Sequence, residues 1–280
     1  MILTGNTYST LFPVSRSSRQ GCPLSPTLFA LSLEPLAQMI RSSSVIKPIT
    51  VHNTHHHLAL YADDILVFLG DPLQSAPHLL TVLDEFGTLS GFGINWSKSA
   101  LMPLNEAART SALPANIPSV THFKYLGIDV FSSLHLIVKH NYTETLNKVL
   151  GDLERWASLP NTLQARISII KRNVLPRINF VSFMVPLCPL VGYWSKLHKA
   201  VSKFIWNGKR PLLRSATVQR RRLDGGLAGP NFKLYHWSFT LRPLVVWFDP
   251  QKAVAWHTME ERMVHPWSLA DVLFANISVR

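Results

Sequence analysis

The chain has 280 residues, enough to bury the core of one large domain or two modest ones. The chain has 28 Lys and Arg against 16 Asp and Glu, a net charge of +12. This excess favours nucleic acid over a membrane as the partner; the alternative is a basic protein with no special partner. The two cysteines, Cys22 and Cys188, exclude a disulfide framework and a paired-cysteine metal site, which favours a reducing compartment.

Two features argue against a secretory signal or a membrane span. Met1–Thr10 has neither a basic start nor a continuous apolar run. The most apolar stretch, Ile178–Val191, is too short to cross a bilayer and contains two prolines, so we expect buried core there. The mean hydropathy of +0.13 is high for so basic a chain and suggests apolar surface that something outside this chain covers.

The N-terminal part of the chain predicts mixed strands and helices. We expect short strands at Ile2-Leu3 and Leu11–Val14 around a turn at Gly5-Asn6. Ser25 and Pro26 resemble an N-cap and a first helical position, and they predict a helix that reaches about Arg41. The leucines expected to face inward from this helix are Leu28, Leu31 and Leu36.

Next comes an apolar run, Leu58–Leu69, interrupted by one acidic pair, which predicts two short strands joined by a tight turn at the acids. Helical spacing of apolar residues predicts a helix over Leu73–Ser90, ended by Gly91. Short strands are expected at Ile94-Asn95 and Tyr125–Val130.

After about residue 140 the pattern becomes helical. One predicted helix has the apolar stripe Tyr142, Leu146, Val149, Leu153 and Trp156. Further helices are expected over Leu163–Leu175, stopped by Pro176, and over Tyr193–Trp206. Beyond Pro211 the chain is less regular, and its glycines mark turns. We place domain boundaries near residues 135 and 210.

The acidic pair Asp63-Asp64, preceded by Tyr61-Ala62, is the most informative short segment. Adjacent carboxylates in an apolar run are costly unless something neutralises them, and a divalent cation with hard oxygen ligands, such as Mg²⁺, does so. In polymerases two such ions flank the reacting phosphate. Taken alone, the tetrapeptide is better explained as a solvated turn, so the metal site depends on the surrounding sequence.

A series of blocks surrounds the acidic pair in a fixed order: Arg19–Pro26 (RQGCPLSP) before it, then Gly91–Ser99 (GFGINWSKS) and Phe123–Ile128 (FKYLGI). This series resembles the second half of the palm of reverse transcriptases. Trp156, Ala165–Ile167 with Lys171, and Leu175–Arg177 are similar to the thumb of LINE-type (non-LTR retrotransposon) enzymes. Phe204–Pro211 and Gly225–Pro230 resemble the segment that follows it, so the similarity reaches about residue 235.

The resemblance implies an α+β fold: a partial polymerase palm over residues 1–135, made of an antiparallel sheet with helices, then a mainly helical thumb-like region over 136–210. Residues 211–280 would be an extension of unknown role. The implied partners are an RNA template, a DNA primer and deoxynucleoside triphosphates, with no membrane and with Mg²⁺ as cofactor. The family's life cycle implies an intracellular setting, nuclear or cytoplasmic.

The same resemblance implies roles for individual residues. Asp63 would ligate the metal, with Asp64 beside it, and Lys98 would meet the charge on the pyrophosphate, unless it is an ordinary surface lysine. The nucleotide and template base would be contacted by Arg19, Gln20, Gly21, Tyr61 and Ala62. A primer-grip hairpin would be formed by Tyr125, Leu126 and Gly127.

The family uses a further aspartate on a neighbouring strand, before the first block. Only eighteen residues precede Arg19 here, and the first acid of the chain is Glu34. We therefore expect the chain alone not to polymerise DNA, because the charge and spacing of the metal-binding carboxylates set the reaction geometry. The alternatives are a separate chain that supplies the missing palm and fingers, a non-catalytic nucleic-acid-binding fragment, or the remnant of a decayed element.

Two other groups could carry function. His52 and His55–His57 could suggest a metal site, but consecutive strand residues point to alternate faces, so a loop or sheet edge is expected instead. A one-signed basic segment with interleaved aromatics favours nucleic-acid contact over a solvated face. The residues predicted to contact nucleic acid are Arg166, Lys171, Lys203, Lys209, Arg210, Arg220, Arg221 and Arg222.

Overall fold

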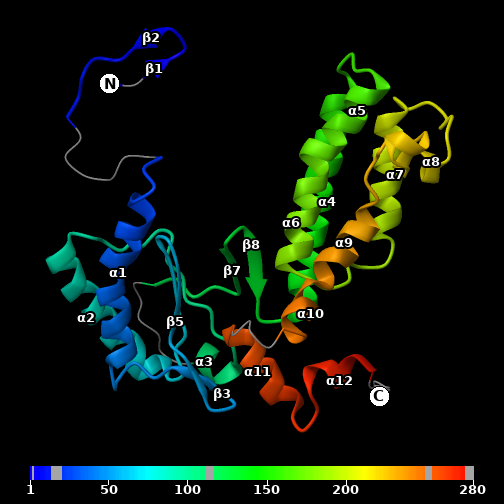
Figure 1. Ribbon diagram of the computed structural model, residues 1–280. Coiled ribbons are helices and arrows are strands. Elements are labelled where there is room, and N and C mark those ends of the chain that lie inside the picture. The colour runs from blue at the N-terminus through cyan, green and yellow to red at the C-terminus, as the bar shows by residue number, and fades with distance from the viewer. Residues whose placement is uncertain (2, 14–20, 111–116, 250–253, 275–280) are drawn as a thin grey trace. The chain divides into compact units, whose positions relative to one another are not determined.

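The computed structural model describes residues 1, 3–13, 21–110, 117–249 and 254–274 (Figure 1). The fold is α+β, as predicted, but the described strands form four separate two-stranded antiparallel sheets instead of one sheet. The chain divides into two compact units, Met1–Ser99 with Thr110–Ile117, and Ala100–Arg109 with Pro118–Arg280. The boundaries at residues 135 and 210, which separate the predicted palm, thumb-like region and extension, stay predictions.

The first unit contains two long helices and three small hairpins. Its elements are β1 (Leu3–Thr4), β2 (Thr7–Tyr8), α1 (Ser25–Ser42), β3 (Ile49–Val51), β4 (Thr54–His56), β5 (Leu58–Tyr61), β6 (Asp64–Val67) and α2 (Pro72–Ser90). Helices α1 and α2 pack through Leu36, Ile40, Val82 and Phe86. The β5–β6 hairpin lies on this core, so its position is fixed by apolar contact.

Helix α1 begins one residue earlier than its sequence suggested. Leu24 is the N-cap and Ser25 is the first helical residue, and no side chain caps this end. Leu28 and Leu31 are 52% and 63% exposed, which contradicts the predicted inward orientation. The buried stripe that meets α2 instead includes Leu33, Leu36 and Ile40, which recur at helical spacing, and Leu28 and Leu31 fall outside it.

Three strand predictions were wrong. The strand after the Gly5-Asn6 turn is Thr7–Tyr8, while Leu11–Pro13 is not a strand and Val14 lies outside the described residues. Ile94-Asn95 is irregular because Asn95 organises a turn there. Tyr125–Val130 is a hairpin and not a single strand, since Leu126 and Gly127 form its turn. The α2 prediction is confirmed, with Gly91 left-handed at its end.

The second unit is mainly helical. Its elements are α3 (Glu106–Thr110), β7 (His122–Tyr125), β8 (Ile128–Phe131), α4 (Leu134–Ala157), α5 (Leu163–Ile169), a π-helical turn (Ile170–Val174), α6 (Leu175–Met184), α7 (Tyr193–Ile205), α8 (Ser215–Gln219), a 3₁₀ turn (Arg222–Asp224), α9 (Phe232–Thr240), α10 (Arg242–Trp247), α11 (Ala255–Val264) and α12 (Leu269–Phe274). The short helices after Pro211 were not predicted.

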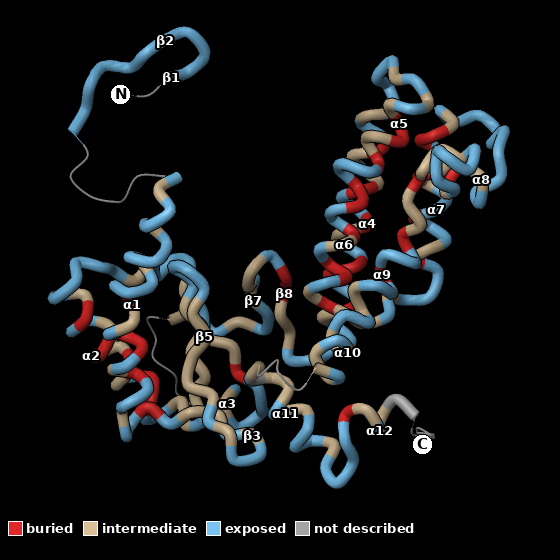
Figure 2. Tube along the Cα trace, viewed as in Figure 1, coloured by how far each residue is buried: buried red, intermediate tan, exposed pale blue. Residues whose placement is uncertain are grey.

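The core of this unit lies between α4, α6 and α7, whose facing sides are coloured as buried in Figure 2. Most of the predicted stripe is confirmed: Tyr142, Leu146, Val149 and Leu153 are buried, and Trp156 is half-buried. Pro176 does not stop its helix as predicted. The π-helical turn before it widens the backbone, which removes the clash that a proline causes in an α-helix, and α6 continues.

The apolar stretch Ile178–Val191 is only partly core. Ile178, Val181 and Val185 are buried, whereas Phe180 and Phe183 on the other face of α6 are exposed. Of the helices in the described ranges, none is long and apolar enough to span a membrane.

Candidate active-site hairpins and nucleic-acid interface

The acidic pair lies at the tip of the β5–β6 hairpin, as predicted. Tyr61 pairs with Asp64, so Ala62 and Asp63 form a two-residue loop. Ala62, the first loop residue, has a φ of 50°, the positive value that a type II′ turn requires at this position. The short loop leaves the carboxylate of Asp63 and that of Asp64 on one rigid tip.

Strand alternation decides which face each residue of the hairpin occupies. Leu58, Ile65 and Val67 pack on the core of the first unit. Tyr61 and Asp64 form a directly opposed pair one position away from the Leu60–Ile65 pair. Because successive side chains of a strand point to opposite faces, Tyr61 and Asp64 lie on the face away from that core. Asp63 and Asp64 are exposed, and within the described residues neither carboxylate has a hydrogen bond or ion pair. Their oxygens are free to bind a hard cation.

The octapeptide before the hairpin is only partly within the described residues. Arg19 and Gln20 lie outside them, so their predicted contacts stay predictions. Gly21 is exposed, with a φ of 83° that favours glycine. The thiol of Cys22 has a pKa below its usual value, because the main chain of Leu24 and the side chain and main chain of Ser25 donate hydrogen bonds that favour the thiolate.

Lys98 follows α2 on a segment anchored by an aromatic contact. The ring of Phe92 stacks on Phe86 with centroids 6.0 Å apart. The carbonyl of Asn95 then accepts hydrogen bonds from the main-chain N–H groups of Lys98 and Ser99, both 3.0 Å long. This turn leaves the Lys98 side chain exposed and without an ion pair to any described residue. A lysine placed so can meet an anion.

The predicted primer-grip residues form the turn of the β7–β8 hairpin. Tyr125 pairs with Ile128, and Leu126 and Gly127 have φ values of 47° and 82°, as in a type I′ turn. A Cβ at position 127 would lie 3.2 Å from Cζ of Phe180, so the α6 ring lies directly against the turn. Helix α6 therefore supports the hairpin from within the same unit.

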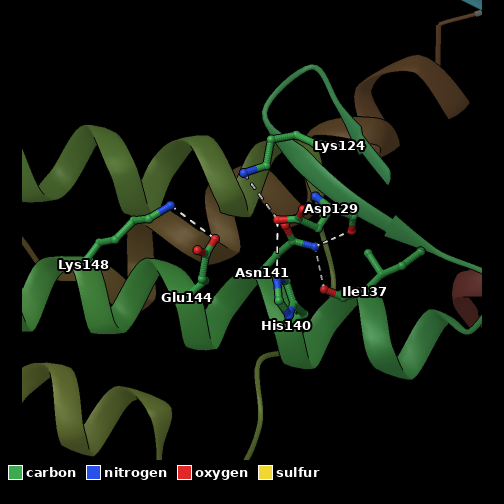
Figure 3. A network of polar contacts seen from close by, with 7 residues as sticks. All are labelled: Lys124, Asp129, Ile137, His140, Asn141, Glu144 and Lys148. Carbon is green, nitrogen blue, oxygen red and sulfur yellow. Dashed lines mark hydrogen bonds and ion pairs between the residues drawn. The ribbon is translucent and has the colours of Figure 1, made fainter. Parts of the chain in front are cut away.

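A polar network that the sequence did not reveal joins this hairpin to α4 (Figure 3). The Asn141 side chain accepts a 2.9 Å hydrogen bond from the main-chain N–H of Asp129 and donates 2.8 Å bonds to the carbonyls of Asp129 and Ile137. The amide thus pairs with β8 as a neighbouring strand would. An asparagine on the buried face of a predicted helix was the signal available in the sequence.

The same network contains three side chains with metal-ligating atoms within 4.8 Å of one another, Asp129, His140 and Glu144. Lys124 lies 3.7 Å from the Asp129 carboxylate, and Lys148 lies 3.2 Å from that of Glu144. The pKa of the Glu144 carboxyl lies below its usual value, and the hydrogen bond from Lys148 is the largest cause. Two lysines already balance two carboxylates, so we interpret this group as an ion-pair network.

Arg166 corrects the predicted set of nucleic-acid contacts. It is only 3% exposed, and its guanidinium donates to the carbonyls of Ala157, Leu159, Asn161 and Phe204 and to Oδ1 of Asn207. Its charge is used inside the protein, where it satisfies the carbonyls at the ends of α4 and α7. It is therefore not available to a phosphate.

The other predicted basic residues are exposed: Lys171, Lys203, Lys209, Arg210, Arg220, Arg221 and Arg222. Arg221 forms a 2.8 Å ion pair with Asp224. In the histidine group, His52 and Asn53 form the β3–β4 turn and His55 and His56 belong to β4, an edge strand of a two-stranded sheet, in line with the expected loop or sheet edge. The described histidines of this group do not join a three-ligand cluster.

Two comparisons with known proteins bear on this chain. Residues 2–130 match the family model of reverse transcriptase (RNA-dependent DNA polymerase). A stretch of 198 residues is 27% identical to the transposon TX1 uncharacterized 149 kDa protein of Xenopus laevis, which covers 69% of this chain. The chain spans 15% of the length of that relative.

Proposed function

The chain belongs to the reverse transcriptases of LINE-type (non-LTR) retrotransposons, and we propose that the β5–β6 hairpin is its part of an RNA-directed DNA polymerase active site. The observation that carries this proposal is the pair of exposed carboxylates on a rigid tip, with no neutralising partner among the described residues. A template strand, a primer and nucleotides are the partners that such an active site needs.

The reverse transcriptase family uses divalent metal ions, and the residues of the hairpin tip fit Mg²⁺. Asp63 and Asp64 offer the hard carboxylate oxygens that this ion prefers. The ion would supply charge stabilisation at the transferring phosphate. Asp63 would be the direct ligand, with Asp64 contributing its charge beside it.

The proposal gives separate tasks to residues of each unit. Tyr61, on the same hairpin face as Asp64, would lie under the primer terminus, and Gly21 would allow the template or nucleotide to approach the backbone closely. Lys98 would stabilise negative charge on the pyrophosphate. The Leu126-Gly127 turn would hold the primer strand, with Phe180 behind it.

Within the described residues, no third carboxylate, histidine or cysteine lies close enough to Asp63 and Asp64 to share a metal ion with them. Two-metal catalysis needs carboxylates on both sides of the ions. We therefore propose that these 280 residues bind template-primer but extend it poorly without a further polypeptide segment that contributes a carboxylate.

The test is primer extension on an RNA template by the purified chain, with Asp63→Asn and Asp64→Asn as isosteric variants and template-primer binding measured in parallel. We expect similar binding by all three proteins and no extension above that of the variants. Robust extension abolished by Asp63→Asn would refute the need for a further segment and uphold the role of the hairpin. Equal, robust extension by wild type and both variants would refute the role of the hairpin.

A further inference from the structure

The second unit contains a groove that the polymerase proposal does not use. It has a volume of about 360 Å³ and lies between α7, α8 and the segment that enters α9. Its floor is a row of apolar side chains on α7, including Trp194 and Val201, continued by Trp206 directly after the helix. Phe232 closes the opposite side. The volume is within the range of about 300–1,000 Å³ found for small-molecule sites.

A chain of neutral polar groups runs along this groove. His198 Nε2 lies 3.0 Å from Oγ of Ser215, and Gln219 Nε2 donates to the same hydroxyl oxygen at 3.3 Å. The side-chain amide of Asn231 donates to Oε1 of Gln219 at 3.1 Å. These four residues all line the groove. Carboxamide, hydroxyl and imidazole groups are the partners that base edges use, and no carboxylate lines the groove in the described chain.

The charge around the groove has one sign. Lys233 lines it, and exposed Lys209 and Arg210 adjoin its lining residue Pro211. From Tyr193 to Phe248 the sequence contains a single acid, Asp224, which is held by Arg221. A surface of this kind complements a phosphate backbone, whereas an apolar peptide would gain nothing from it.

We propose that this groove binds an unpaired base of a single-stranded nucleic acid, whose phosphates contact the basic residues at the rim. The base would stack on the tryptophan-containing floor while its edge bonds to the Ser215–Gln219–Asn231 chain. The inference rests on the proposed polymerase function only in taking nucleic acid as the partner. It assigns to α7, α8 and the segment that enters α9 the capture of template or product that leaves the duplex.

A matched pair of variants on one helix tests the groove. Ser202→Tyr places a ring in the groove, whereas Ser195→Tyr adds the same ring to an exposed position of α7 outside it. Gln219→Ala removes the polar edge without adding bulk, and circular dichroism checks that each variant folds. The probes are labelled single-stranded RNA and DNA of one sequence, each also made with a single abasic site at every position in turn.

We expect Ser202→Tyr to weaken binding by about tenfold, because its ring takes the place of the stacked base. Gln219→Ala should weaken binding by about tenfold, because the base edge loses a hydrogen-bonding partner. Ser195→Tyr should bind as the wild type does. One abasic position should weaken wild-type binding and have no further effect on Ser202→Tyr. Weaker binding of RNA, of DNA or of both by the groove variants supports the proposal. A loss of affinity for RNA alone would indicate a further contact to the 2′-hydroxyl.

Two results would overturn the inference. Equal affinity of Ser202→Tyr and Ser195→Tyr would mean that the groove does not contact the strand. A Ser202→Tyr defect that persists unchanged with every abasic probe would mean that the groove holds something other than a base. Neither result would affect the role proposed for Asp63, which primer extension tests separately. If the wild-type protein bound no nucleic acid at all, the polymerase proposal itself would be contradicted.

Discussion

Arg166 shows how a single charge can be committed to the interior of a basic protein. Its guanidinium donates to five acceptors, which come from the end of α4, the loop before α5 and the end of α7. It also lies over the ring of Phe204, 5.0 Å from the centroid. A planar group with five N–H donors is suited to this junction, whereas a lysine ammonium has three.

We expect Arg166→Ala to lower the free energy of unfolding by about 3 kcal/mol, because it leaves several buried carbonyls without a donor. Arg166→Lys should recover only part of that loss. Lys171→Ala, at an exposed neighbouring position, should change stability by less than about 0.5 kcal/mol. Urea unfolding followed by circular dichroism measures all three, and equal stability of Arg166→Ala and Lys171→Ala would show that the junction is unimportant.

At this scale the sequence predicted some residues well and others not at all. Asp63 and Asp64 could be located because two adjacent acids in an apolar run predict the tip of a hairpin, a purely local property. The role of Arg166 could not be predicted, because its acceptors at Ala157 and Phe204 come from other helices. Asn141 was missed for the same reason: its partner, Asp129, is fixed by packing of β8 on α4.

At the scale of elements, the β7–β8 turn and α6 depend on each other. Gly127 adopts a left-handed φ of 82°, and its missing side chain leaves room for the ring of Phe180. Phe180 lies on the half-exposed side of α6, with the edge of its ring beside the turn. The turn proposed to grip the primer is therefore supported by α6.

Gly127→Ala should destabilise the second unit by about 1–2 kcal/mol, because a Cβ is disfavoured at this φ and would press on the Phe180 ring. Gly151→Ala is the matched control. Gly151 lies inside α4 with open space at its Cβ, so alanine there should stabilise by about 0.5–1 kcal/mol. Thermal unfolding compares the two variants, and the prediction fails if both shift the midpoint in the same direction.

The elements were easier to predict than their buried faces. Apolar periodicity located α2 and α7 closely and α4 except for its first turns, because a helix imposes that periodicity whatever it packs on. The inward face of α1 was wrong, since it is set by where α2 contacts it. The continuation of the helix through Pro176 was also missed, because a π-helical turn has no clear sequence signal.

At the scale of the whole molecule, the net charge of +12 is only partly available to a partner. Arg166 is buried, and Arg155 and Arg177 both pair with Asp152. Arg220 and Arg222 are exposed and unpaired among the described residues, whereas Arg221 between them is held by Asp224. The three neighbouring arginines should therefore contribute unequally to binding of a polyanion.

The salt dependence of nucleic-acid binding measures this inequality. Each Lys or Arg that neutralises a phosphate contributes about 0.7–0.9 to the slope of log affinity against log salt, because counterions are released. Arg220→Ala and Arg222→Ala should each lower the slope by close to that amount, and Arg221→Ala by clearly less, because Asp224 already neutralises it. Asp224→Asn should free Arg221 and steepen the slope. Equal effects of the three arginine variants, or no change in Asp224→Asn, would show that this ion pair does not limit the charge offered to nucleic acid.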